Sequence, residues 1–186
     1  MYSSTSLWIE AAPRDVYDLV SDLDSWKASL PHYRYVKILG WVEGATFAAM
    51  GAWRGPIPVS WVARQMVDPE ALTIRFLHIR GVTRGMEVIW TFTPEGDGTR
   101  ARVEHGLEFG VPLVGEWIAT HIIARQFIEP IVRKTLGCFR TLAEAETHRL
   151  KLRAQALASF ENRARGSVER RPPEKRPPES LRNSAS

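Results

Sequence analysis

The sequence predicts one α+β domain, in which a curved antiparallel sheet of seven strands wraps around a long C-terminal helix, with two short helices after the first strand. Two observations predict this architecture. From Tyr33 to Phe109 hydrophobicity alternates with a period of two, and turn residues recur at short intervals. After Pro112 the period becomes that of a helix. Connections this short allow only antiparallel neighbours, because a parallel crossover needs about a dozen residues or more.

The N-terminal segment predicts the first strand and both short helices. Thr5–Glu10 is extended. Pro13 suits the first helical position, and an acidic residue in the first turn favours the positive helix terminus, so a helix over Asp15–Val20 is expected. A second helix carries Trp26 on its apolar side and stops at Pro31.

The C-terminal part predicts two helices and a tail. Leu113–Gln126 is one candidate, and Ile128 to about Arg165 is the other. The second has an apolar stripe formed by Ile131, Thr135, Cys138 and Leu142, with Ile128, Leu136 and Phe139 beside it. The Pro-, Arg- and Ser-rich end has too few apolar residues to offset its ordering entropy. We expect a domain over 1–147, a helical extension over 148–165 and a disordered basic tail over 166–186.

Charge and hydropathy disfavour nucleic-acid and membrane partners. The formal net charge is +4, but Arg163–Arg182 alone holds seven Arg or Lys against three Glu, so the globular part is close to neutral. Nucleic-acid surfaces need basic residues clustered on a folded face. The uncharged run Ile118–Ala124 is far shorter than the roughly 20 residues of a membrane span. We expect neither nucleic-acid binding nor stable membrane insertion.

A cytoplasmic location is predicted from the N-terminus and the cysteine content. The opening residues, MYSSTSLWIEAAP, lack the basic start and apolar block of a secretory signal. Cys138 is the only cysteine, so no intrachain disulfide can form.

Strand alternation sorts the side chains of the sheet into two faces, because successive side chains point to opposite sides. The sets predicted to face the helix are Phe47, Ala49, Gly51 and Trp53; Val59, Trp61, Ala63 and Gln65; Leu72, Ile74, Phe76 and His78; Met86, Val88, Trp90 and Phe92; and Val103, His105, Leu107 and Phe109.

Hairpin registers bring five of these residues together. A turn between Pro69 and Glu70 predicts that Trp61 lies opposite His78, and the next hairpins add Met86, Val88 and His105 to the cluster. A buried imidazole needs a partner. Two interpretations stay open: each histidine bonds backbone or water in a filled core, or the pair bonds a ligand carbonyl or hydroxyl in a mostly apolar cavity.

No metal or cofactor site is predicted. The five histidines lack close ligand spacing, and the chain has no GxSxG, GxxxxGK or GxGxxG motif after a strand. Glu87, Glu104 and Glu108 fall on the outward face. Acid–base chemistry would therefore have to use His78 or His105.

Local sequence adds a family resemblance. The stretches IEAAPRDVYDLVSDLDSWKASLPHYRYVKIL, IPVSWVARQ, ALTIRFLHIRGVTRGMEVIWTFTPEGDGTRARVEH and RKTLGCFRTLAEAE, together with the element order, resemble the START-like or SRPBCC superfamily, in its polyketide cyclase/dehydrase and coenzyme Q-binding branch. The resemblance implies a helix-grip fold whose ligand lies between the sheet and the C-terminal helix, gated by the two short helices and the hairpin loops. By position, it implies the pocket residues Trp26, Trp53, Trp61, His78, Met86, Trp90, His105, Phe127 and Ile131.

Three function classes follow. The first is a carrier or sensor of a small hydrophobic molecule such as a lipid, quinone or polyketide-like compound. The second is an aromatase/cyclase-type enzyme that uses His78 and His105 for proton transfer or carbonyl orientation. Pockets of such enzymes are more polar than the inward faces here, which favours the carrier. The third is an interaction domain with a filled core; a homo-oligomer through the C-terminal helix is compatible with each class.

Overall fold

The structure has the predicted α+β architecture. The computed structural model describes residues 2–81, 83–107 and 129–169, with the side chains of the last helix described as far as Phe160. The elements are β1 (Tyr2–Ile9), α1 (Pro13–Ser21), α2 (Trp26–Ser29), β2 (Tyr33–Val42), β3 (Ala45–Arg54), β4 (Ile57–Asp68), β5 (Thr73–Gly81), β6 (Met86–Glu95), β7 (Gly98–Leu107) and α4 (Glu129–Glu169).

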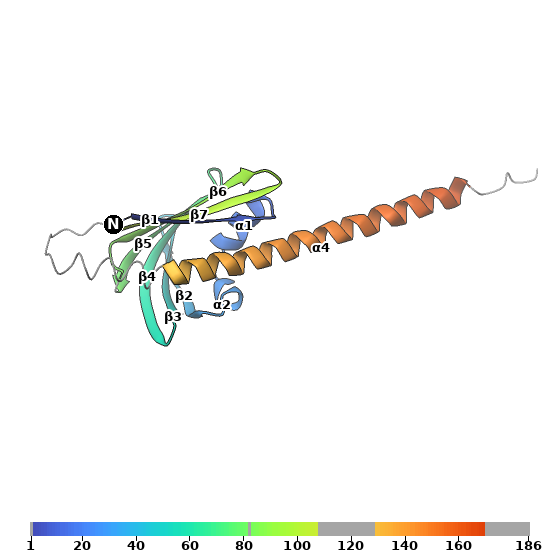
Figure 1. Cartoon of the computed structure of the whole chain (residues 1–186). Coiled ribbons are helices and arrows are strands. Elements are labelled where there is room, and N and C mark those ends of the chain that lie inside the picture. Colours follow the sequence, from blue (N-terminus) through green and yellow to red (C-terminus); the bar gives the residue numbers. More distant parts are fainter. Residues whose placement is uncertain (1, 82, 108–128, 170–186) are drawn as a thin grey trace, which may run out of the picture. The chain divides into compact units, whose positions relative to one another are not determined.

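The seven strands form one antiparallel sheet in the order β1-β7-β6-β5-β4-β3-β2. From β2 to β7 each strand pairs with the next in the chain, and β1 pairs with β7. Figure 1 shows these strands curving around the N-terminal turns of α4. The predicted helix-grip fold, with two short helices after the first strand, is confirmed.

The chain divides into two compact units, Met1–Thr147 and His148–Ser186. The first contains the sheet, α1, α2 and the start of α4. The second contains the rest of α4, which is helical to Glu169, whereas the sequence predicted that the helix ends near Arg165 and that the tail begins at residue 166. A helix propagates cooperatively until a residue breaks it, and the first proline after Pro130 is Pro172.

Two predictions from the sequence lie outside the described residues. These are the helix over Leu113–Gln126 and the tail beyond Glu169. Among the described residues, no helix combines the length and the apolar character that a membrane crossing requires.

The inward faces of β4 to β7 are as predicted where their side chains are described, which excludes Leu107 and Phe109. Fully or largely buried residues on these strands are Ala63, Gln65, Ile74, Phe76, His78, Met86, Val88, Trp90, Phe92, Val103 and His105. The apolar members of this set join residues of α1, α2 and the start of α4 in one hydrophobic core. The alternation was decisive here because the opposite face of these strands carries charged and hydroxyl side chains.

The face assignment of β3 was wrong. Ala48, Met50 and Ala52 point into the core, whereas Trp53 is 44% exposed and lies under the Arg34 guanidinium, 4.9 Å from the ring centroid. Both faces of β3 are apolar, so hydrophobicity could not distinguish them.

The buried stripe of α4 is displaced from the predicted one. Val132, Thr135, Leu136, Phe139 and Ala143 are buried; Thr135 lies on the predicted stripe, and Leu136 and Phe139 were predicted beside it. Leu142 is 39% exposed. The helix turns its bulkiest side chain, Phe139, toward the sheet, since a phenyl ring removes more apolar area from water than its neighbours do.

The end of β5 requires a glycine. Gly81 has φ +99°, and a Cβ there would lie 2.4 Å from the Ser60 carbonyl oxygen. Gly81→Ala is therefore expected to lower the free energy of unfolding by about 3 kcal/mol, because it adds a backbone clash to an unfavourable conformation. The matched control is Gly96→Ala, where φ is +62° and the space is open, with an expected cost of about 1 kcal/mol. Equal urea denaturation midpoints would contradict this expectation.

Candidate functional site

A cavity of about 350 Å³ lies between the concave face of the sheet and the start of α4. Such a volume is within the range of small-molecule sites, roughly 300–1,000 Å³. Among the described residues, it is lined by Trp26, Tyr33, Met50, Ile57, Pro58, Val59, Trp61, Phe76, His78, Thr83, Met86, Val88, Trp90, His105, Ile131, Val132 and Thr135. None of these side chains is acidic, and none is Lys or Arg.

The helix α2 supplies one aromatic wall. Trp26 is almost fully buried, and its indole Nε1–H donates to the Val20 carbonyl oxygen at 2.9 Å. Its ring packs edge-on against Tyr33, with centroids 5.5 Å apart, and against Trp90 at 6.3 Å. Because its N–H is already bonded, Trp26 can offer a ligand only its ring face or edge.

Two tryptophans of the sheet add to the aromatic lining. Trp61 from β4 stacks on the His78 ring, with centroids 5.6 Å apart and an angle of 11° between the planes. Trp90 from β6 packs edge-on against Phe139 of α4. Within the described residues the Trp90 indole N–H has no hydrogen-bond partner, so it remains available as a donor.

The contact of Trp61 with His78 was predicted, but not its register. Ala63 pairs with His78 because the hairpin is centred between Glu70 and Ala71, one residue later than predicted, and Trp61 pairs with Gly81 because Ile79 of β5 forms a bulge opposite Val62 and Ala63. A bulge adds one residue to a strand and re-aims its side chains. The two rings still stack, so the interaction was correct although the pairing was wrong.

His78 is held by the hairpin that follows β5. Its Nδ1 lies 2.6 Å from the Thr83 hydroxyl oxygen, and Thr83 is buried although it belongs to the turn. The turn is closed by bonds from the Gly85 N–H to the His78 carbonyl and from the Met86 N–H to the Thr83 carbonyl. Burial, and to a lesser degree the nearby His105, lowers the pKa of His78 to about 3, so the ring is neutral at pH 7.

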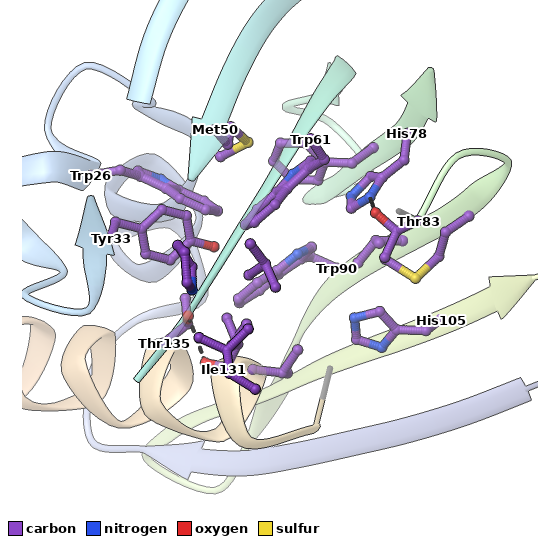
Figure 2. Close-up of a pocket in the computed structure, with 17 residues that line it drawn as sticks. Trp26, Tyr33, Met50, Trp61, His78, Thr83, Trp90, His105, Ile131 and Thr135 are labelled. Carbon is purple, nitrogen blue, oxygen red and sulfur yellow. Dashed lines mark hydrogen bonds between the residues drawn. The ribbon is translucent and has the colours of Figure 1, made fainter. Parts of the chain in front are cut away.

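His105 lies on β7, directly opposite Val88 of β6. It is 3% exposed, and within the described residues its ring nitrogens have no hydrogen-bond partner. Burial lowers its pKa to about 4, so this imidazole is also neutral at pH 7. Figure 2 shows His78, Thr83 and His105 on one side of the cavity.

A second polar group lies on the opposite side of the cavity, where Figure 2 shows Tyr33 and Thr135. The Thr135 hydroxyl donates to the Ile131 carbonyl at 2.9 Å and lies 2.9 Å from His32 Nε2. Since the only hydroxyl proton is used, His32 must be the donor in the second bond. Burial raises the pKa of Tyr33, while its bond to Thr135 opposes the rise, and the phenol therefore stays protonated.

The structure brings together seven of the nine residues predicted for the pocket. They are Trp26, Trp61, His78, Met86, Trp90, His105 and Ile131. Trp53 is on the outer face and does not line the cavity. Phe127 lies outside the described residues.

Sequence reasoning missed three polar residues of the cavity, namely Tyr33, Thr83 and Thr135. Tyr33 begins β2 and Thr83 lies in a turn, and neither position belongs to the interior of an alternating strand. The signal for Thr135 was available, since it lies on the predicted stripe of α4. In the described part of the chain, no three His, Cys, Asp or Glu side chains gather as metal ligands would.

Comparison with known structures supports the same fold. A protein of Thermus thermophilus is 24% identical, with a TM-score of 0.67, covering 78% of this chain and 99% of that one. The aromatase/cyclase Zhui from Streptomyces sp. R1128 is 15% identical, with a TM-score of 0.68 and coverage of 79% and 95%. A START superfamily protein of Mycobacterium smegmatis is 16% identical, with a TM-score of 0.56 and coverage of 80% and 98%.

Sequence comparison identifies the family. No curated protein matches the chain. Residues 9–131, however, match the family described as polyketide cyclase / dehydrase and lipid transport, and this range spans the strands and short helices that build the cavity. The chain has the START-like fold and belongs to the polyketide cyclase / dehydrase and lipid transport family.

Proposed function

We propose that the protein binds a small hydrophobic molecule in this cavity and acts as a carrier or sensor. The observation that carries the proposal is the lining: indole rings and aliphatic side chains form the walls, and a few neutral polar groups converge at two places. Small-molecule sites have this composition, because apolar walls supply affinity and sparse polar groups fix orientation. The lack of charged residues among the described lining favours an uncharged ligand.

Ring systems suit this cavity better than a single flexible chain does. Trp26, Trp61 and Trp90 present flat or edge-on aromatic surfaces from three different elements. Aromatic pairs gain roughly 0.5–1.5 kcal/mol beyond the area that they bury. We therefore favour a quinone-like or polyketide-like aromatic ligand over an acyl lipid.

An aromatase/cyclase role is the second candidate, since the family description and the Zhui enzyme both refer to cyclisation. Proton transfer is most effective when the pKa of the catalytic group is near the working pH. His78 and His105, with pKa values of about 3 and 4, are weak bases at neutral pH. They are better suited to holding a carbonyl than to abstracting a proton, which favours binding.

Trp61→Ala is expected to weaken binding of 2-acetylnaphthalene, a neutral two-ring ketone, at least roughly tenfold in isothermal titration calorimetry at pH 7.5. The variant removes one wall of the cavity and the stacking partner of His78. Trp53→Ala is the matched control, because it removes the same side chain from the outer face; its affinity should equal that of the unmodified protein.

Two results would change the proposal. Equal affinities of the Trp61→Ala variant and the unmodified protein would mean that the ligand does not occupy this cavity. A new product, detected by mass spectrometry when a poly-ketone chain is incubated with the protein, would favour the enzyme over the carrier. A cytoplasmic location and association through the C-terminal helix stay predictions.

A further inference from the structure

We propose that the cavity selects neutral ligands that place a carbonyl or hydroxyl oxygen beside His78 and His105, and that it discriminates against carboxylates of the same shape. This inference rests on the proposed function, and it adds the chemical class of the ligand. It is carried by three features of the described residues: the uncharged lining, the Thr83 contact of His78 and the unpartnered ring of His105.

The uncharged lining sets the first condition. Within the described part of the chain, no Lys or Arg side chain lines the cavity, so these residues offer a bound carboxylate no fixed countercharge. Removing an ion from water without a countercharge is strongly unfavourable. A ketone of the same shape has no such penalty, because its carbonyl needs only a hydrogen-bond donor.

His78 can serve either kind of neutral oxygen. Its Nδ1 is bonded to the Thr83 hydroxyl at 2.6 Å, and that hydroxyl can donate or accept. When Thr83 donates, Nε2 carries the proton and can donate to a ligand carbonyl. When Thr83 accepts, Nε2 is free to accept from a ligand hydroxyl. In both tautomers the ring is neutral, and the stacked Trp61 holds its plane.

His105 supplies a second polar group that borders the cavity. A neutral imidazole can donate a hydrogen bond to a ligand oxygen from one ring nitrogen and accept one at the other. Within the described residues His105 has no partner, and Figure 2 shows its ring on the same side of the cavity as His78 and Thr83. A ligand oxygen placed there satisfies the buried ring.

Among the described lining residues, a protonated His105 could supply the positive charge that a bound carboxylate lacks. The pKa of His105 sets the free-energy cost of that protonation. Burial holds the pKa of His105 at about 4, and His78 lies nearby with a pKa of about 3. At pH 7 a carboxylate that recruits a proton to His105 has to overcome about three pH units, a penalty of about 1,000-fold. The attraction between the carboxylate and a protonated His105 offsets only part of this penalty. The ketone is therefore expected to bind roughly 100-fold more tightly than the carboxylate.

The test compares three ligands of the same shape on the unmodified full chain by isothermal titration calorimetry at pH 7.5. They are 2-acetylnaphthalene, 2-naphthoate, in which a carboxylate oxygen replaces the methyl group, and 2-isopropylnaphthalene, in which a methyl group replaces the carbonyl oxygen. The dissociation constant of 2-naphthoate should exceed that of the ketone by roughly 100-fold. A difference below about tenfold would overturn the inference while leaving the proposed function intact.

Variants test the hydrogen bond separately. His105→Leu should weaken ketone binding about fivefold to tenfold relative to the hydrocarbon, whereas His105→Gln, which keeps a neutral donor, should retain the ratio of the two affinities. His148→Leu is the matched control, because His148 is exposed on α4. An unchanged ratio in His105→Leu overturns the role of His105. Failure of all three ligands to bind the unmodified protein would overturn the proposed function itself, together with the inference.

Discussion

Lowering the pH from 7 to 5.5 is expected to reduce the free energy of unfolding by about 2.5 kcal/mol, because two buried histidines stay neutral in the fold but take up protons when the chain unfolds. Their ordinary pKa is 6.5, and burial lowers it to about 3 for His78 and about 4 for His105. Their contribution to stability is complete above pH 6.5 and is lost as the pH falls from 6.5 toward 4. His32, whose pKa is also lowered by burial, adds a loss of the same sign.

Urea denaturation at half-unit steps between pH 7 and 5.5 measures this slope. Few carboxylates titrate in that window, since their ordinary pKa values are near 4. The double variant His78→Gln, His105→Gln should show a clearly shallower slope, because glutamine takes up no proton. A flat profile in the unmodified protein, or the same slope in both proteins, would show that these imidazoles are not held neutral by the fold.

The second large effect concerns the helix that the sheet encloses. Phe139→Ala is expected to lower the free energy of unfolding by about 4 kcal/mol, as truncation of a fully buried phenyl ring does elsewhere. The ring is 0% exposed, 5.5 Å from the Trp26 centroid and 6.3 Å from the Trp90 centroid. It therefore connects α4 with α2 and the sheet through a single side chain.

The matched control for this variant is Leu142→Ala, at a position that lies three residues further along α4 and is 39% exposed. Alanine has the highest helix propensity, so neither substitution weakens the helix itself. The control substitution should lower the free energy of unfolding by about 1 kcal/mol or less, because its side chain is only partly buried. Similar losses in the two variants would indicate that Phe139 does not anchor α4 to the sheet.

The sequence alone determined the architecture. Alternating apolar residues separated by short turns admit only an antiparallel meander, and the change to helical periodicity after Pro112 places a helix at the C-terminal end. The faces of β5 to β7 also followed from the sequence, because their outward sides carry Arg, Glu and Thr. His78, Trp90 and His105 could thus be assigned to one side of the sheet.

Only the tertiary structure decided the face of β3 and the polar contacts of the cavity. Both sides of β3 are largely apolar, so alternation could not decide which way Trp53 points. The centre of the β4–β5 hairpin and the bulge at Ile79 of β5 set the register of these strands, which alternation cannot reveal. The Thr83 contact of His78 and the Thr135 contact of Tyr33 join segments from a turn, a strand start and a helix. Local periodicity determines which way a side chain points, whereas packing between distant segments determines what it meets.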